Sequence, residues 1–200
     1  MDKPQLLASL KAQGFPQKIL QAFAKVPRGY FLPQNLQAYA YEDQALPLEQ
    51  GATISQPYTI AFMLNLLDIK PSQKILEIGS GCGYVLAILS KLSPSSKIYG
   101  IEVIKSLAEK SKQIISELKY KNVNVLDGNG FQGLKEKAPF DRILISAAAD
   151  KLPEHLYPQL SNDGIIVTPV LGSIVQIKKQ KGKIKLKEFP GFVFVPLVRA

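Results

Sequence analysis

Three glycines at alternate positions follow an apolar segment that carries a single acid. The segment is 75–78 and contains Glu77, and the glycines are Gly79, Gly81 and Gly83. This order is typical of a buried parallel strand that ends in a tight turn before a helix. Glycines let the backbone approach a ligand closely, and the free N–H groups of a helix start attract an electron-rich group. The sequence therefore predicts a nucleotide or nucleoside pocket at the carboxyl end of a strand.

The spacing of this loop distinguishes two kinds of ligand. A dinucleotide site requires G-x-G-x-x-G, whereas the glycines here are one residue closer together. Glu77 precedes the loop, where its negative charge would repel a diphosphate but would tolerate a ligand with a positive centre. S-adenosylmethionine has a sulfonium, an ammonium and no phosphate, so it fits the pattern better. We expect this cofactor to contact Glu77, Gly79, Ser80, Gly81 and Gly83.

Polar residues at the ends of two further predicted strands extend this pocket. Glu102 ends the strand 97–102, about 20 residues past the loop, where a carboxylate can accept both hydroxyls of a ribose. The alternative is an acid that caps the next helix. Asn129 and Gly130 follow the strand 122–126, and the Asn129 side chain could accept a hydrogen bond from an adenine amino group. A plain β-turn would also explain these two residues.

The composition indicates one domain with an appended subdomain. The chain has 200 residues, of which 46% are hydrophobic, enough for a sizeable core. Its formal net charge of +9 is a feature of proteins that bind nucleic acid or acidic partners. However, the lysines are spread widely, and the one dense cluster, 178–187, is typical of an edge strand protected against aggregation. We therefore expect no nucleic-acid partner.

Residue counts exclude several other classes of protein. With 1 cysteine and 1 histidine, the chain has no internal disulfide and too few soft ligands for a zinc site, so we expect no metal. No charged and then apolar leader opens the chain, and no apolar run approaches the roughly 18 residues that span a bilayer. The sequence therefore predicts a cytoplasmic protein without a membrane partner.

Strand and helix patterns alternate from residue 57 onward, which predicts a doubly wound, Rossmann-like α/β sheet. Two consecutive strand patterns, 173–179 and 183–195, predict an antiparallel hairpin at the C-terminal end. We expect the other strands at 74–78, 97–102, 122–126, 140–146 and 164–170, and helices at 57–68, 83–92, 104–119 and 153–160.

The first 56 residues have a different texture. Two short amphipathic helices are expected at 3–12 and 16–25, and prolines then impose irregular segments. We therefore divide the chain into a helical and loop extension, residues 1–56, and a methyltransferase-like core, residues 57–200, within one compact domain. Long irregular segments are often functional, so the extension is expected to form part of a substrate site.

Motifs along nearly the whole chain resemble those of one enzyme family, the bacterial protein-L-isoaspartate (D-aspartate) O-methyltransferases. The most specific are Thr53-Ile54-Ser55-Gln56-Pro57 and Phe194-Val195-Pro196-Leu197-Val198, whereas the glycine loop is shared by many methyltransferases. The Asn/Asp-Pro-Pro-Tyr/Phe motif of nucleobase amino-methyltransferases is absent from 146–150. Other matching segments are Val26-Pro27-Arg28, Ala40-Tyr41-Glu42-Asp43, Leu46-Pro47-Leu48, Gly128-x-Gly130 and Ala138-Pro139-Phe140-Asp141.

The resemblance implies methyl transfer from S-adenosylmethionine to the free α-carboxylate of L-isoaspartyl residues in damaged proteins and peptides. The family name extends this substrate class to D-aspartyl residues. S-adenosylhomocysteine is the by-product, and the ester returns to normal aspartate through a succinimide. Such a carboxyl group has a pKa of about 3.5, so it is ionised at neutral pH and needs no general base. The enzyme need only hold one oxygen in line with the methyl donor. A monomer would best admit large substrates.

The resemblance also assigns roles to individual residues. It places Ser55 at the substrate carboxylate and the cofactor, where its hydroxyl would position the carboxylate, and it places Thr53 at the cofactor. It implies substrate contacts for Asp43, for Ile54 and for the backbone of Val195. Alternatively, Ser55 or Thr53 caps the following helix, Asp43 is a solvated acid, and Val195 belongs to an ordinary strand.

Three residues depart from the family pattern. Asn129 stands where aspartate is usual, Cys82 where serine is usual, and Asp163 where glycine is usual. Asn129 keeps an acceptor oxygen but loses the charge, which is expected to lower cofactor affinity modestly. Asp163 is expected to tolerate a left-handed backbone. Two alternatives stay open. The positive charge would suit a methyltransferase that acts on RNA or a small molecule, and the departures would suit a cofactor-binding protein with little turnover.

Overall fold

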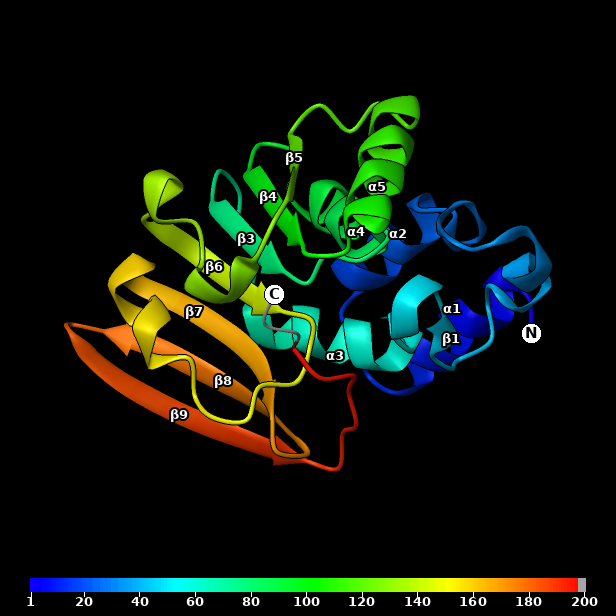
Figure 1. Cartoon of the computed structure of the whole chain (residues 1–200). Coiled ribbons are helices and arrows are strands. Elements are labelled where there is room, and N and C mark those ends of the chain that lie inside the picture. The colour runs from blue at the N-terminus through cyan, green and yellow to red at the C-terminus, as the bar shows by residue number, and fades with distance from the viewer. Residues whose placement is uncertain (198–200) are drawn as a thin grey trace.

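A seven-stranded sheet forms the centre of the computed structural model, which describes residues 1–197 (Figure 1). The strands follow one another in space as β5 (Val123–Asp127), β4 (Lys97–Glu102), β3 (Lys74–Ile78), β6 (Phe140–Ile145), β7 (Leu160–Val170), β8 (Ser173–Gln180) and β9 (Lys183–Pro190). The first five are parallel, and β8 and β9 add antiparallel pairs. The chain winds outward in opposite directions from β3 and β6, so a ligand crevice is expected at the carboxyl ends of these two strands.

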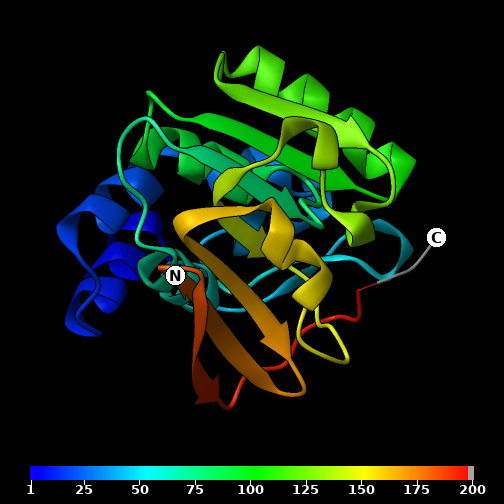
Figure 2. The ribbon, with the colours of Figure 1, turned by 90° about the vertical axis from the view of Figure 1, so that its left-hand side faces the viewer.

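The two faces of the sheet have different covers. The helices α3 (Pro57–Leu67), α4 (Tyr84–Leu92) and α5 (Lys105–Glu117) pack on the face to which Ile75 and Val167 contribute. Shorter 3-10 turns cover the other face, over a second apolar cluster that contains Leu76 and Phe140. These turns are η4 (Gly130–Gln132), η5 (Lys135–Lys137) and η6 (Glu154–Gln159). Figure 2 shows the β8–β9 hairpin at the edge of the molecule away from α5.

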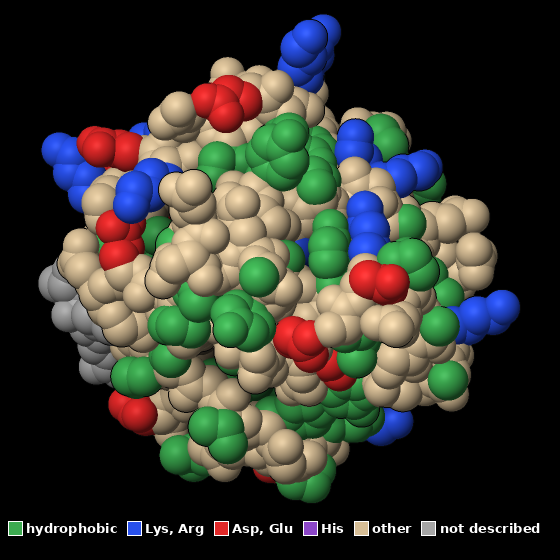
Figure 3. Space-filling model, turned by 90° about the vertical axis from the view of Figure 1, so that its right-hand side faces the viewer, with side chains coloured by type: hydrophobic (Ala, Val, Ile, Leu, Met, Phe, Trp, Pro, Cys, Tyr) green, Lys and Arg blue, Asp and Glu red, His purple; other side chains and the backbone are tan. Residues whose placement is uncertain are grey.

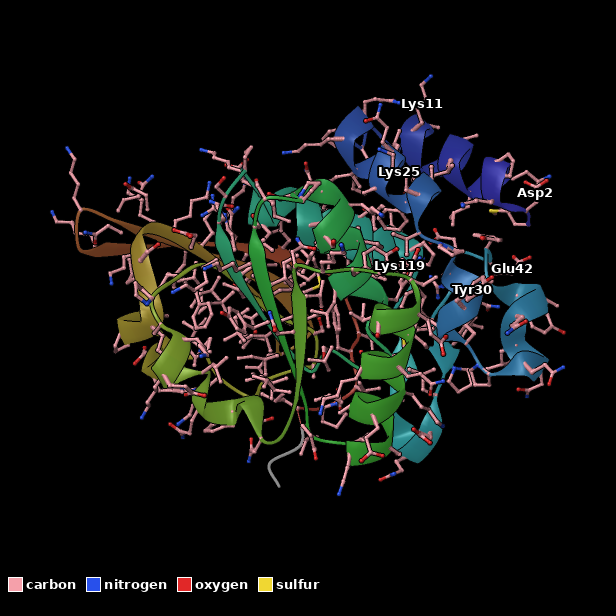
Figure 4. All side chains as sticks on the ribbon, turned by 90° about the horizontal axis from the view of Figure 1, so that it is seen from above. Asp2, Lys11, Lys25, Tyr30, Glu42 and Lys119 are labelled. Carbon is pink, nitrogen blue, oxygen red and sulfur yellow. The ribbon has the colours of Figure 1, made fainter. Side chains whose placement is uncertain are left out.

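The N-terminal extension packs into the larger of these two cores. Its apolar side chains at helical spacing, such as Leu6, Leu10, Ile19 and Phe23, are buried together with those of α3 and α4. Figure 4 shows Asp2 and Glu42 at the end of the molecule where the Met1 amine forms an ion pair with Glu42. The elements of the extension are α1 (Lys3–Ala12), α2 (Gln17–Lys25), η1 (Arg28–Phe31), η2 (Gln34–Tyr39), β1 (Leu46–Pro47), η3 (Glu49–Gly51) and β2 (Thr53–Ile54).

Most expected elements are present within two residues of their expected bounds, but three differ more widely or in type. The expected helix 153–160 is the 3-10 turn η6, because Pro158 lies inside it and has no N–H to donate. β7 begins at Leu160, earlier than expected, and includes Asp163 with φ 61°, the left-handed conformation anticipated for that residue. β9 ends at Pro190 instead of continuing to residue 195, because Gly191 with φ 97° turns the chain out of the sheet. Val198 lies outside the described residues.

The surface in Figure 3 carries lysine, arginine and acidic side chains scattered among one another.

Across residues 1–197, no helix has both the length and the apolar character needed to cross a bilayer. Within the same range, no group of three or more histidine, cysteine or acidic residues could hold a metal ion.

Candidate active site

A cleft of about 270 Å³ lies at the carboxyl ends of β3, β4 and β6. It is lined by the glycine loop and Glu102 on one side, and by residues 50–53 and 195–197 on the other. A smaller cavity of about 40 Å³ is lined by Ser55 and Glu77, among others. Both spaces share four lining residues: Thr53, Gly79, Gly81 and Ser146. The structure therefore brings most of the predicted cofactor residues together, next to Ser55.

The glycine loop adopts a backbone that requires glycine. Gly79, Gly81 and Gly83 have φ angles of 74°, 52° and 85°, which side chains with a Cβ rarely adopt. Gly83 is also the N-cap of α4, and a Cβ there would lie 2.2 Å from the Ser111 hydroxyl oxygen. Between these glycines, Ser80 is buried and its hydroxyl has no hydrogen-bond partner within residues 1–197. The loop thus places backbone close to the cleft and leaves room for a ligand.

Glu102 is buried at the end of β4 and connects two parts of the site. One carboxylate oxygen accepts a hydrogen bond from the Gly81 N–H at 2.7 Å, and the other accepts from the Ile104 N–H at 2.9 Å. Ile104 is the N-cap residue of α5, so the helix-capping alternative is correct in part. Glu102 also lines the cleft. Each carboxylate oxygen has a second lone pair, so ribose hydroxyls can still bind there.

Glu77 lies on the β3 face that points toward α3 and α4, and it is 1% exposed. Its Oε1 accepts a hydrogen bond from the Ser146 hydroxyl at 2.7 Å, whereas Oε2 is buried without a partner within the described residues. Desolvation by burial raises the pKa of Glu77 to about 8, and the Ser146 hydrogen bond opposes this rise. Sequence reasoning anticipated an acid beside the glycine loop, but not that its pKa would be raised.

The residues after β5 divide between the cleft and its surroundings. Gly130 lines the cleft, and a Cβ on it would lie 2.8 Å from the Ile78 side chain, so glycine is needed for close packing. Asn129 is exposed, and its side-chain oxygen accepts a hydrogen bond from the Phe131 N–H at 2.9 Å. It does not itself line the described cleft. The adenine contact of Asn129 therefore stays a prediction, while its turn-forming role is observed.

Ser55 and Thr53 do not cap α3. The N-cap of this helix is Gln56, without a side-chain hydrogen bond. Asp43 supplies the missing acceptor, because its Oδ1 accepts from the Tyr58 N–H at 2.8 Å. The Ser55 hydroxyl makes no hydrogen bond within residues 1–197, and it is left available at the cavity that Ser55 lines. The structure thus places Asp43 as a helix cap, whereas its predicted substrate contact is untested.

Ile54 and Val195 reach the site from opposite ends of the chain. Ile54 is buried in β2 and lines the smaller cavity. Val195 lines the cleft and is held by its main chain, since its carbonyl accepts from the Ala148 N–H at 2.8 Å. The Leu197 N–H in turn donates to the Ala148 carbonyl at 2.7 Å. The segment after β9 is therefore tied to the loop that follows β6, and its substrate role is not tested.

Sequence reasoning missed two features of the site. Ser146 follows β6 directly and supplies the hydroxyl that meets Glu77, a role that its position at a strand end could have suggested. The loop 49–52 reaches the cleft through Gln50 and is joined to α5, because Lys110 donates to the Glu49 carboxylate at 3.0 Å. This hydrogen bond lowers the pKa of Glu49. No local pattern connects Glu49 with a helix so distant in sequence.

Comparison with known proteins identifies the family. The model of the protein-L-isoaspartate(D-aspartate) O-methyltransferase family matches residues 1–200. The chain belongs to this family. The protein-L-isoaspartate O-methyltransferase of Methanothrix thermoacetophila is 38% identical over 202 residues, which cover 99% of this chain and 95% of that protein.

Solved structures of the same family have the same fold. A protein-L-isoaspartate O-methyltransferase superposes with a TM-score of 0.89 at 26% identity, over 98% of this chain and 65% of the other. A Plasmodium falciparum protein assigned as a protein-L-isoaspartate O-methyltransferase superposes with a TM-score of 0.86 at 27% identity, over 99% of both chains. That protein is in complex with S-adenosyl-L-homocysteine. The predicted Rossmann-like methyltransferase fold with a C-terminal antiparallel hairpin is confirmed.

The residues present in this isoaspartate methyltransferase fit an S-adenosyl cofactor. The glycine loop leaves space where Cβ atoms would intrude, Glu102 offers carboxylate lone pairs, and the unpartnered oxygen of Glu77 suits a positive group. Cys82, a departure from the family pattern, is buried, and burial raises the pKa of its thiol to about 11. Because thiolates are the readily oxidised form, Cys82 is protected in this site.

Proposed function

We propose that this chain transfers the methyl group of S-adenosylmethionine to the free α-carboxylate of L-isoaspartyl residues in damaged proteins and peptides. The observation that carries this function is the shared boundary between two spaces. The cleft that contains Glu102 and the glycine loop meets the cavity lined by Ser55 at Thr53, Gly79, Gly81 and Ser146. A cofactor that lies in the cleft and reaches Glu77 with its positive end would then be adjacent to an acceptor held by Ser55.

Bound S-adenosylmethionine supplies an electrophilic methyl group, and the residues of this chain supply position. An α-carboxylate with a pKa of about 3.5 is already ionised at neutral pH, so no residue has to remove a proton. The Ser55 hydroxyl is available for a hydrogen bond to one carboxylate oxygen, which holds the other oxygen toward the donor. Covalent catalysis is not required. The neighbouring backbone amide nitrogen then attacks the methyl ester and expels methanol, which gives a succinimide that water opens to aspartate or isoaspartate.

The N-terminal extension and the segment after β9 are the remaining parts of the proposed substrate side. We propose that Ile54 and the main chain of Val195 contact the polypeptide around the isoaspartyl residue, and that the extension 1–56 thereby completes the site. Asp43 acts on this side through α3, because it holds the Tyr58 N–H. We further propose a monomeric, cytoplasmic enzyme, in keeping with its one free cysteine, Cys82.

A paired-peptide assay tests this function. The protein is incubated with methyl-labelled S-adenosylmethionine and two peptides that differ only in an aspartyl or isoaspartyl linkage. We expect a labelled methyl ester on the isoaspartyl peptide alone, and a D-aspartyl peptide tests the wider specificity. Label in RNA instead would favour a nucleic-acid methyltransferase. Cofactor binding without transfer to any acceptor would indicate a binding protein with little turnover.

A further inference from the structure

Glu77 is a buried acid without a compensating positive charge. Its side chain is 1% exposed, Oε1 accepts from Ser146, and Oε2 is buried without a hydrogen-bond partner within residues 1–197. It lines the same small cavity as Ser55. A carboxylate removed from water is costly unless it is paired, so a lone acid in this place favours its neutral form.

The groups around Glu77 do not supply the missing positive charge. Glu102, from β4, adds negative charge, while Cys82 and Tyr84 at the start of α4 are a neutral thiol and phenol whose pKa values are raised by burial. Arg28 from the extension stacks on the Tyr84 ring at 5.5 Å and forms no ion pair with Glu77. The side chains that β6, the residue after it and α3 place on the cavity are uncharged: Leu144, Ser146, Ile60 and Met63. Burial accordingly raises the pKa of Glu77 to about 8.

We propose that Glu77 is protonated before the cofactor binds and releases this proton to solvent when the cofactor arrives, becoming the counter-ion of its positive end. The inference rests on the proposed function, because S-adenosylmethionine brings the sulfonium and the ammonium. The O–H bond of Glu77 breaks, the proton passes to the buffer, and the carboxylate keeps the electron pair. The buried positive charge is thereby matched by a buried negative one.

Titration calorimetry on the full chain tests the proposal directly. S-adenosylmethionine is titrated at pH 6.5 in buffers with different enthalpies of ionisation, and the slope of the observed heat gives the number of protons released. We expect about one proton per bound cofactor in the wild type, because the free pKa lies well above this pH. Glu77→Gln keeps the shape and a partner for Ser146 but cannot ionise, so we expect it to release none.

A matched control and a second readout make the test specific. Asp127→Asn removes an exposed acid from the end of β5, and this variant should release as many protons as the wild type. Between pH 5.5 and 7 the ligand ammonium stays charged. As the pH rises through this range, the wild-type Kd for S-adenosylmethionine should fall about tenfold per pH unit. The Kd of Glu77→Gln should not change with pH.

Two results would overturn the proposal. One is wild-type binding without proton release and with a pH-independent Kd. The other is unchanged proton release in a folded Glu77→Gln variant. Absence of any cofactor binding in every buffer would overturn the proposed function instead, and this inference with it, so the two failures are distinguishable.

Discussion

The two sides of the cleft are held in different ways. The strand-end side consists of the glycine loop, Glu77 and Glu102, which are buried in the sheet or fixed by hydrogen bonds to the main chain. The outer side consists of residues 49–55 and 191–197, which are tied down by a few contacts such as Lys110 to Glu49. From this difference we expect the strand-end side to keep its shape more firmly than the outer side.

The strongest test of the strand-end side is Gly83→Ala. The φ of 85° strains any residue with a Cβ, and a Cβ only 2.2 Å from the Ser111 hydroxyl oxygen would force Ser111 to move. We expect the free energy of unfolding in urea to fall by roughly 2–4 kcal/mol. Gly81→Ala is the control, because nothing lies within 4 Å of its Cβ position, and it should cost about 1 kcal/mol. Equal losses would contradict the crowding argument.

Ser55→Ala tests the outer side. Loss of one hydrogen bond to a charged carboxylate, worth about 1.5–3 kcal/mol, should lower kcat for an isoaspartyl peptide roughly ten- to a hundredfold. The melting temperature should not change, because Ser55 caps no helix. Ser116→Ala, an exposed serine on α5, is the control and should keep full turnover. Unchanged kcat in Ser55→Ala would remove this residue from the mechanism.

The raised pKa of Glu77 predicts how stability without cofactor depends on pH. Because its folded-state pKa of about 8 exceeds the ordinary value of 4.5, the folded state binds more protons than the unfolded state between these values. The contribution of Glu77 is therefore full below about pH 4.5 and is lost as pH rises toward 8, by at most about 1.4 kcal/mol per pH unit. Denaturant unfolding between pH 5 and 8 measures the free energy of unfolding of the wild type and of Glu77→Gln. If the two free energies change with pH in parallel, the prediction is wrong.

The smallest expected effect concerns the contact between loop 49–52 and α5. Lys110→Ala removes an exposed ion pair worth about 0.2–1 kcal/mol, so S-adenosylhomocysteine should dissociate about 1.5- to 5-fold faster. Stopped-flow measurement should show this difference shrinking at high salt. Lys112→Ala, on the same helix but beside a different groove, should leave the rate unchanged. A rate that is the same in all three proteins would show that the loop does not retain the cofactor.

The same contrast explains what could be predicted from the sequence. The glycine loop, the alternating elements and the strand-end acid Glu102 are local patterns, and the structure contains all of them. The hydrogen bond between Ser146 and Glu77 joins residues 69 apart, and the Asp43 cap acts on a helix 15 residues away. Such pairs depend on how the sheet and the extension pack. Local patterns therefore predict the strand ends and their glycines, but not the hydrogen bonds that join them to the rest of the site.

Phe192 offers a way to observe the outer side in solution. It follows β9 and stacks on Phe62 and Tyr58, with ring centroids 5.1 and 6.5 Å away. The chain contains no tryptophan, so Phe192→Trp would place a single indole fluorophore between the C-terminal segment and α3. Its emission wavelength would report whether that segment opens when a damaged peptide arrives, without any external dye.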